Sequence, residues 1–150
     1  MGAVRPSQQG ERPRGLTIAI AGNPNCGKSA LFNALTGIRQ KTGNWPGVTV
    51  ERKEGRSRID GRDVTVVDLP GIYSFDAASL DEQLTRAYLL SRDADLVINV
   101  VEASNPERTL YFTVQLLAMG GPLGLALTLL AVARTRGVAV DAGVLAAGLG

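Results

Sequence analysis

The segment Gly22-Asn-Pro-Asn-Cys-Gly-Lys-Ser29 constrains the fold of this chain more than any other stretch. It fits the spacing G-x-x-x-x-G-K-[ST] between a short apolar run and an apparent helix, the context that separates a phosphate-binding loop from a chance match. We expect Gly22 and Gly27 to adopt left-handed backbone conformations, so that successive N–H groups point inward and form an anion site. The following helix would direct its positive end at the same point. The alternative is a glycine-rich turn whose lysine is solvated.

Two further chemical roles follow from this interpretation. Lys28 would place its charge on the outer phosphates, and the Ser29 hydroxyl would ligate Mg²⁺. A second signal, Asp68-Leu-Pro-Gly71, closes an apolar strand, where the carboxylate could reach the Mg²⁺ shell through water and the Gly71 N–H could meet a terminal phosphate. Alone, this pattern usually marks a turn, but behind a phosphate loop it becomes a strong signal. The residues expected to line the nucleotide in this loop and the first helical turn are Gly22, Asn23, Pro24, Asn25, Cys26, Gly27, Lys28, Ser29 and Ala30.

Apolar patterns along the chain predict strands that alternate with helices. Strands are expected over 16–21, 48–59, 62–68, 96–101 and 123–127, and helices over 29–35, 79–90 and 105–119, with a short helix after the last strand. Residues 37–47 look like a loop, and Asp60-Gly61 is a strong hairpin signal. This order predicts an α/β fold whose sheet is mostly parallel, covered by helices on both faces, with one hairpin as an antiparallel edge.

Composition excludes several classes of protein. A chain of 150 residues with 45% hydrophobic content suits one domain, and a net charge of +2 is too small to argue for nucleic acid or an anionic membrane surface. A single cysteine and no histidine favour a reducing compartment without a zinc cluster. Residues 1–15 are expected to form a flexible tail that is neither a signal peptide nor an anchor. The uncharged stretch 109–133 could span a bilayer, but Gly120-Gly121-Pro122 interrupts it, which favours a helix, a turn and a buried strand.

Several stretches of the chain resemble the N-terminal G domain of the FeoB ferrous-iron transporters. They are GNPNCGKSALFNALTG, KTGNWPGVTVERKEG, VVDLPGIYSF, SLDEQ and DADLVINVVEASNPERTLYFTVQLL, which together cover nearly all of positions 16 to 118. The resemblance implies a Ras-like GTPase fold, binding of GTP, GDP and Mg²⁺, and slow GTP hydrolysis that regulates Fe²⁺ uptake. The permease that carries the iron would lie outside this chain. The fragment itself is then expected to be soluble, at the cytoplasmic face of the inner membrane.

The resemblance also implies roles for particular residues. Thr49 looks like the switch threonine that ligates Mg²⁺ and senses the third phosphate, so that Lys28, Thr49, Gly71 and Asn25 form the expected catalytic set. Asn25 would help to hold an activating K⁺, over which residues 43–47 would close with backbone carbonyls. A monovalent cation there would neutralise developing charge much as an arginine finger does.

Three other side chains in these stretches carry expectations. Ile72 stands where related proteins carry a water-orienting glutamine, so hydrolysis should be slow. Trp45 is either a core residue or part of a mobile, partly exposed switch, and its glycine-flanked loop favours the switch. Cys26 is expected to be a small filler.

The chain departs from the family pattern where guanine is read. The family carries Asn-x-x-Asp after the last predicted strand, whereas this chain has Thr128-Leu-Leu-Ala131. The missing aspartate would accept two hydrogen bonds from guanine, each contributing roughly 1.5–3 kcal/mol, so its loss predicts weak binding with little preference over ATP.

The chain also stops at Gly150, so residues 16–150 are expected to form a G domain that lacks its last strand–helix pair. An open sheet edge of this kind favours a homo-oligomer. Two functional readings remain: a GTP-binding switch and slow hydrolase, or a degenerate module that acts through protein contacts. A phosphate-loop kinase is a distant third.

Overall fold

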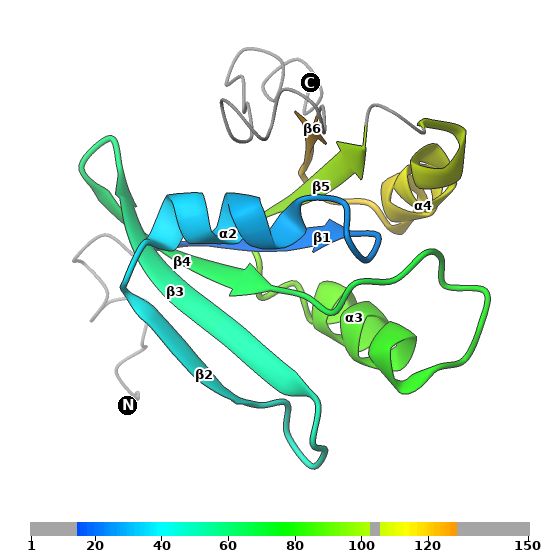
Figure 1. Ribbon diagram of the computed structural model, residues 1–150, viewed down its shortest axis with the longest axis horizontal. Coiled ribbons are helices and arrows are strands. Elements are labelled where there is room, and N and C mark those ends of the chain that lie inside the picture. Colours follow the sequence, from blue (N-terminus) through cyan, green and yellow to red (C-terminus); the bar gives the residue numbers. More distant parts are fainter. Residues whose placement is uncertain (1–14, 103–105, 129–150) are drawn as a thin grey trace, which may run out of the picture.

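A six-stranded sheet forms the centre of the molecule, with the strand order β2-β3-β4-β1-β5-β6. The computed structural model describes residues 15–102 and 106–128 (Figure 1). The strands are β1 (Leu16–Gly22), β2 (Gln40–Asn44), β3 (Glu51–Ile59), β4 (Arg62–Asp68), β5 (Leu96–Glu102) and β6 (Leu123–Thr128). The helices are α2 (Lys28–Thr36), α3 (Leu80–Ser91) and α4 (Pro106–Met119).

The parallel part of the sheet brings the ends of distant strands together. β1 lies between β4 and β5, parallel to both, and β6 pairs in parallel with β5. In this register Ile20 is level with Asp68 on one side and with Ile98 on the other. The carboxyl ends of β1 and β4 therefore meet at one edge, where ligands bind in open α/β sheets. This arrangement confirms the predicted α/β fold with a mostly parallel sheet.

The antiparallel edge is wider than the sequence indicated. The predicted hairpin joins β3 to β4 through Asp60 and Gly61, whose φ angles are 52° and 77°, as a tight two-residue turn requires. A further strand, β2, pairs with β3, so the prediction of a continuous loop over 37–47 was wrong for these five residues. All five are exposed and polar or glycine, so β2 carries no hydrophobic alternation and forms because β3 supplies backbone partners.

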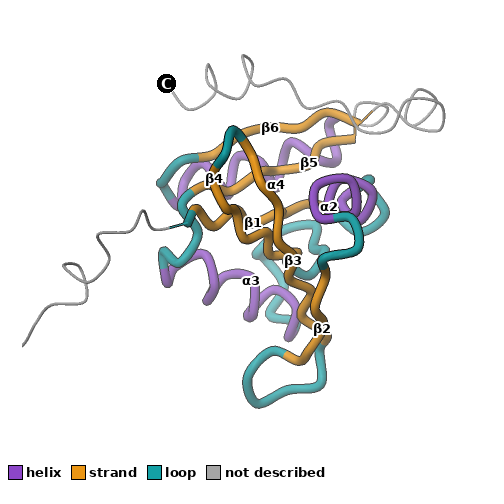
Figure 2. The backbone as a smooth tube through the Cα atoms, turned by 90° about the vertical axis from the view of Figure 1, so that its left-hand side faces the viewer, coloured by secondary structure: helices purple, strands orange, loops and turns teal. Residues whose placement is uncertain are grey.

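Side chains of the central strands alternate between two cores. On one face α2 covers the cluster that contains Ile18, Ile20, Phe32 and Val66. On the other face α3 and α4 cover a second cluster around Leu69, Leu89 and Phe112 (Figure 2). The sheet is thus covered on both faces, as predicted.

Trp45 belongs to the core on the α3 face, and this corrects the expectation of a partly exposed switch residue. Its side chain is only 4% exposed and packs with the cluster that includes Tyr88 and Leu89. The neighbouring glycines suggested exposure. However, Trp45 directly follows Asn44, the last residue of β2, and its indole packs against Tyr88 of α3. A large apolar ring gains more from burial there than from contact with water.

The remaining predictions concern the helices. Ser79 caps α3, as its capping-box pattern predicts, and its hydroxyl accepts a hydrogen bond of 3.2 Å from the Glu82 N–H. The uncharged stretch forms α4, a turn and β6, as far as residue 128. In the described part of the chain, no helix combines the length and the apolar character needed to cross a membrane. The short helix expected after β6 lies outside the described residues.

Candidate functional site

The glycine-rich loop connects the carboxyl end of β1 to the amino end of α2. Asn25 and Gly27 adopt left-handed conformations, with φ angles of 63° and 97°. Gly22, which we expected to be left-handed, has no positive φ angle and is needed for a different reason. A Cβ atom at this position would lie 2.8 Å from Cys26 Sγ and 3.0 Å from the Val100 carbonyl oxygen. The loop therefore curls through Asn25 and Gly27, while Gly22 permits close packing against β5.

The amino end of α2 is suited to an anion. Gly27 occupies the N-cap position, where it provides no side-chain hydrogen bond, and the first turn contains no acidic residue. The first N–H that bonds back within the helix is that of Leu31, which donates to the Gly27 carbonyl at 3.1 Å. The N–H groups of Lys28, Ser29 and Ala30 come before that of Leu31, in the first turn. Donors of the first turn have no carbonyl partner within the helix. These donors and the helix dipole favour a negatively charged ligand.

Lys28 and Asp68 form a buried ion pair across this end of the sheet. The Lys28 Nζ lies 2.6 Å from Asp68 Oδ1, and the two side chains are 10% and 9% exposed. β1 and β4 bring them together although they lie 40 positions apart in the sequence. The structure thus joins the two motifs that the sequence analysis singled out separately. An entering phosphate would compete with the Asp68 carboxylate for the Lys28 ammonium.

The second motif also packs directly on the loop. A Cβ atom on Gly71 would lie 3.0 Å from the Pro24 Cα, so only glycine allows this approach. The Ile72 N–H donates to the Gly22 carbonyl at 3.1 Å, and the Ile72 side chain is buried in the α3-side core. Asn23 is 4% exposed, and its Oδ1 has no hydrogen-bond partner among the described residues. A lysine, a carboxylate and a serine hydroxyl on one loop and its neighbour fit a phosphate group together with Mg²⁺.

Cys26 fills space inside the loop, as predicted. Its side chain is completely buried and packs in the cluster with Leu31 and Phe32 on the α2 face. This burial raises the pKa of the thiol, although the nearby Lys28 opposes the shift. The thiol is therefore kept neutral at pH 7, and its role is packing.

Other predicted site residues lie apart from Lys28 or beyond the described residues. Thr49 is exposed in the loop between β2 and β3. The backbone N–H of Trp45 donates to the Val50 carbonyl at 2.9 Å and closes this loop. This loop lies away from the glycine-rich loop in both views (Figures 1 and 2). Gly43 is part of β2, opposite Arg52. Thr128 ends β6 level with Glu102, and Ala131 lies outside the described residues.

Lys53 is a neighbour of the site that the sequence analysis missed. It lies directly opposite Asp68 in the antiparallel pair of β3 and β4. The two-residue turn at Asp60 and Gly61 sets this register, so counting back along both strands from the turn would have found the pair.

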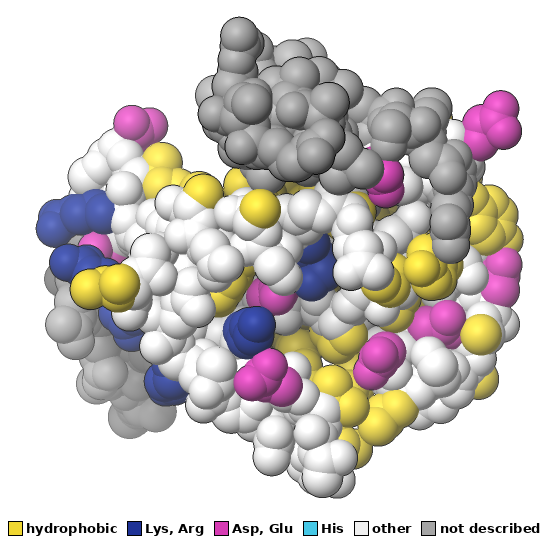
Figure 3. All heavy atoms as spheres, in the orientation of Figure 1, with side chains coloured by type: hydrophobic (Ala, Val, Ile, Leu, Met, Phe, Trp, Pro, Cys, Tyr) yellow, Lys and Arg dark blue, Asp and Glu magenta, His cyan; other side chains and the backbone are white. Residues whose placement is uncertain are grey.

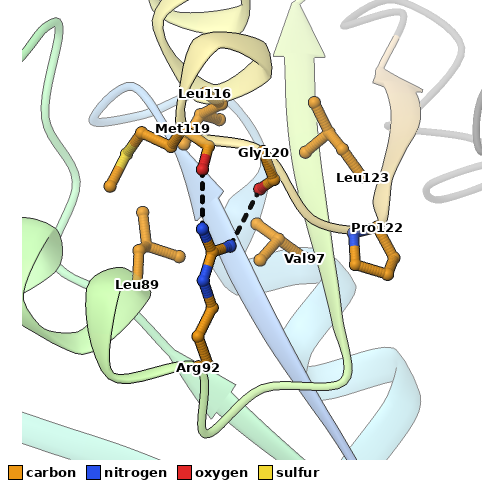
Figure 4. Close-up of a pocket in the computed structure, with 8 residues that line it drawn as sticks. All are labelled: Leu89, Arg92, Val97, Leu116, Met119, Gly120, Pro122 and Leu123. Atoms are coloured by element: carbon orange, nitrogen blue, oxygen red, sulfur yellow. Dashed lines mark hydrogen bonds between the residues drawn. The ribbon is translucent and has the colours of Figure 1, made fainter.

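Arg92 lines a hollow at the opposite end of the sheet (Figure 4). Arg92 ends α3 in a left-handed conformation with a φ of 62°, and its guanidinium donates to the carbonyls of Met119 and Gly120 at 2.8 and 3.1 Å. Val97 and Leu123, at the amino ends of β5 and β6, line the hollow. Because the glycine-rich loop follows the carboxyl end of β1, this hollow is separate from the candidate site. The hydrogen bonds of Arg92 link the end of α3 to the end of α4.

Comparison with known proteins gives a family match over most of the chain. Residues 16–150 match the family model described as ferrous iron transport protein B. The Fe(2+) transporter FeoB of Salmonella typhimurium is 55% identical over 139 residues, which cover 90% of this chain and 18% of that protein. The Fe(2+) transporter FeoB of Escherichia coli K12 is 54% identical with the same coverage. The chain thus spans about a fifth of the length of these curated relatives.

Solved structures agree with the fold. The G domain of the T. maritima FeoB iron transporter has a TM-score of 0.76 and 46% identity, covering 89% of this chain and 82% of that one. The cytosolic domain of the same transporter in a GDP form has a TM-score of 0.77 and 46% identity, over 91% and 54% of the two chains. An S. thermophilus variant bound to mGDP has a TM-score of 0.75 and 45% identity, over 87% and 50%. These similarities confirm the predicted Ras-like fold of a G domain.

Proposed function

This chain belongs to the family of ferrous iron transport protein B, FeoB, and from this premise we propose that it is a guanine-nucleotide-binding switch domain that hydrolyses GTP slowly. The ion pair between Lys28 and Asp68 carries the proposal, because it places the lysine of a phosphate loop and the acidic residue of a second motif at one point. Solved relatives described as GDP forms support the choice of nucleotide. Binding of GTP, GDP and Mg²⁺ by this chain is part of the proposal.

The residues around the loop then have distinct tasks. Lys28 leaves Asp68 to neutralise phosphate charge, while backbone N–H groups of the loop hold the phosphate oxygens. Ser29, Thr49 and Asp68 would hold Mg²⁺, which supplies a positive charge that stabilises the charge developing on the phosphates. For Thr49 to take part, the loop between β2 and β3 must move toward the phosphate loop. The Gly71 N–H, fixed by contact with Pro24, would meet the terminal phosphate.

Slow hydrolysis follows from the surroundings of Ile72 and depends on a monovalent cation. The Ile72 side chain is 3% exposed and cannot hydrogen-bond to an attacking water, so no side chain at this position orients the nucleophile. We propose that K⁺, held by Asn25 and the carbonyls of residues 43–47, supplies compensating charge. Asn25 is exposed on the phosphate loop, so ions from the solvent can reach its side chain.

The domain would serve a transporter larger than this chain. Its curated relatives are Fe(2+) transporters of which it spans 18%, so a membrane permease in the same protein is the expected partner. We place the domain at the cytoplasmic face of the cell membrane, where it would regulate ferrous-iron uptake. A homo-oligomer formed through an outer strand of the described sheet is a further part of this proposal.

One observation favours a second candidate function, a degenerate G domain that binds nucleotide weakly and acts through protein contacts. Thr128 and Ala131 occupy the positions where the family carries an asparagine and an aspartate. Alanine offers no acceptor to the guanine ring, and a threonine hydroxyl cannot replace both groups. Phosphate and Mg²⁺ recognition would remain in such a domain.

Calorimetric titration separates the two candidates. We expect the chain to bind GDP in the presence of Mg²⁺, with loss of binding in Lys28→Ala and no loss in the control Lys41→Ala, whose side chain is exposed on β2. GDP binding that exceeds ADP binding by more than about tenfold would favour the guanine-selective switch. Equal and weak binding of both would favour the degenerate module. Absence of any nucleotide binding would contradict both.

A further inference from the structure

Lys53 lies on the same face of the sheet as Asp68. The two residues are directly opposite in the antiparallel pair of β3 and β4. Directly opposite residues share one face, and their Cβ atoms lie about 4.5–5.5 Å apart. The Lys53 side chain therefore starts beside the carboxylate that pairs with Lys28.

α2 covers this face, which places Lys53 on the side of the phosphate loop. Gly55 follows Lys53 on the same face, and a Cβ atom there would lie 2.4 Å from Thr36 Cγ2, near the end of α2. At the other end of this helix, Lys28 reaches Asp68 at 2.6 Å. Lys53 is half-buried and level with Asp68. Figure 3 shows basic and acidic side chains gathered near the centre of this face, below α2.

The charges at this point do not balance. Asp68 has one lysine bound to it and a second lysine on the adjoining strand. Three other charged residues of β3 are in ion pairs, Arg52 with Glu54 at 3.3 Å and Arg58 with Asp63 of β4 at 4.0 Å. Over residues 15–102 and 106–128, Lys53 forms no ion pair within 4.0 Å, including with Glu51 on its own face. The site thus holds one cation more than its carboxylate needs while Lys28 stays in place.

We propose that Lys53 is a positioning residue that replaces Lys28 beside Asp68 when Lys28 turns to the phosphates of a nucleotide. This inference rests on the proposed nucleotide binding. A buried carboxylate that loses its only cation is strongly destabilising, so the departure of Lys28 needs a substitute. Mg²⁺ can be that substitute when it is present. Lys53 therefore matters most for nucleotide bound without Mg²⁺, and it competes with Mg²⁺ for the same carboxylate.

The test compares GDP affinity with excess Mg²⁺ and with EDTA, by calorimetry on the full chain. Lys53→Met should lower the affinity for Mg²⁺-free GDP about tenfold, as expected for one lost charge-assisted interaction at a half-exposed position. Its affinity for GDP with Mg²⁺ should change less than about threefold. Lys53→Arg should restore the Mg²⁺-free affinity. The matched control Lys41→Met, which removes an exposed lysine from β2, should change neither value.

Each outcome assigns the failure to one proposal. Equal losses with and without Mg²⁺ would show a general structural or electrostatic effect and overturn the role of Lys53, as would no loss in either condition. In both cases the nucleotide-binding function would stand. If the unmodified chain binds GDP in neither condition, the proposed function fails and the inference fails with it. Thermal unfolding of Lys53→Met and Lys41→Met without ligand shows whether the Lys53 variant is misfolded. If it is, the Mg²⁺-free GDP affinity of Lys53→Arg tests the role of Lys53 instead, and failure of Lys53→Arg to bind as the unmodified chain does would overturn that role.

Discussion

The indole ring of Trp45 packs edge-on against the phenol ring of Tyr88, with centroids 5.7 Å apart and ring planes at 74°. The Arg52 guanidinium lies over the same indole, 4.7 Å from its centroid. Trp45 belongs to the loop after β2 and Tyr88 to α3, so this contact fixes the loop that carries Thr49 to a helix on the far side of the sheet. Movement of Thr49 toward the phosphate loop must therefore disturb the Trp45 contact.

Trp45 gives a direct optical test of that movement. It is the only tryptophan of the chain, and it is 4% exposed. Saturating GTP with Mg²⁺ should shift its fluorescence toward that of a solvated indole, because the loop leaves the core. Trp45→Ala should lower the free energy of unfolding by about 3–5 kcal/mol, as for other buried large aromatic residues. Heat of nucleotide binding without any change in emission would show that the loop stays in place.

The ion pair between Lys28 and Asp68 predicts a coupled effect on stability. Lys28→Ala removes the cation bound to a buried carboxylate and should cost up to about 3–5 kcal/mol of unfolding free energy, and less where Lys53 takes its place. Adding Asp68→Asn to that variant should recover much of this loss, since the buried charge is removed. Urea unfolding of both variants and the single Asp68→Asn measures the coupling. Additive losses would mean that the pair does not form in solution.

Close packing at Gly22 predicts intolerance of even a methyl group. Gly22→Ala should destabilise the fold by about 1–3 kcal/mol, because the new Cβ would meet Cys26 Sγ and the Val100 carbonyl. Gly43→Ala is the matched control, since nothing lies within 4 Å of a Cβ there and the position has no positive φ. Thermal or urea unfolding compares the two. Similar stability of both variants would contradict the close approach of β5 to the loop.

Hydrolysis of GTP should depend on K⁺ through Asn25. We expect hydrolysis in K⁺ to exceed that in Na⁺ at equal ionic strength by at least about tenfold, because the ion neutralises charge that develops in the transition state. Asn25→Ala should remove the difference between the two salts without removing GDP binding. Phosphate release measured in both salts tests this, and equal rates for the unmodified chain would exclude the cation site.

The second candidate function, a degenerate G domain, predicts weak base selectivity in the unmodified chain. GTP and ATP affinities should lie within about tenfold, a difference under roughly 1.4 kcal/mol, since phosphates and Mg²⁺ are common to both. The double change Thr128→Asn with Ala131→Asp should raise GTP affinity selectively, because the new carboxylate accepts hydrogen bonds from guanine. Competition titration with both nucleotides measures the ratio. Tight and GTP-selective binding by the unmodified chain would show that another residue reads the base.

Local patterns predicted most of the described elements. A strand, turn or helix-cap preference is set by a few neighbouring residues, and such local preferences predicted the strands β1 and β5, the turn at Asp60 and Gly61, and the cap at Ser79. β2 could not be found this way, because its polar residues form a strand only where β3 offers backbone partners. The roles of Thr49 and of Asn25 come from the family resemblance and stay predictions.

The sequence by itself determined the glycine-rich loop after β1, the motif that begins at Asp68 and the α/β order, since spacing and hydrophobic period are properties of neighbouring residues. Only the tertiary structure decided how these parts meet. Strand pairing placed Lys28 against Asp68 and Lys53 opposite the same carboxylate. Packing turned Trp45 into the core, because burial depends on which surfaces the sheet and α3 leave between them. Such contacts join residues far apart in the chain, so no local pattern records them.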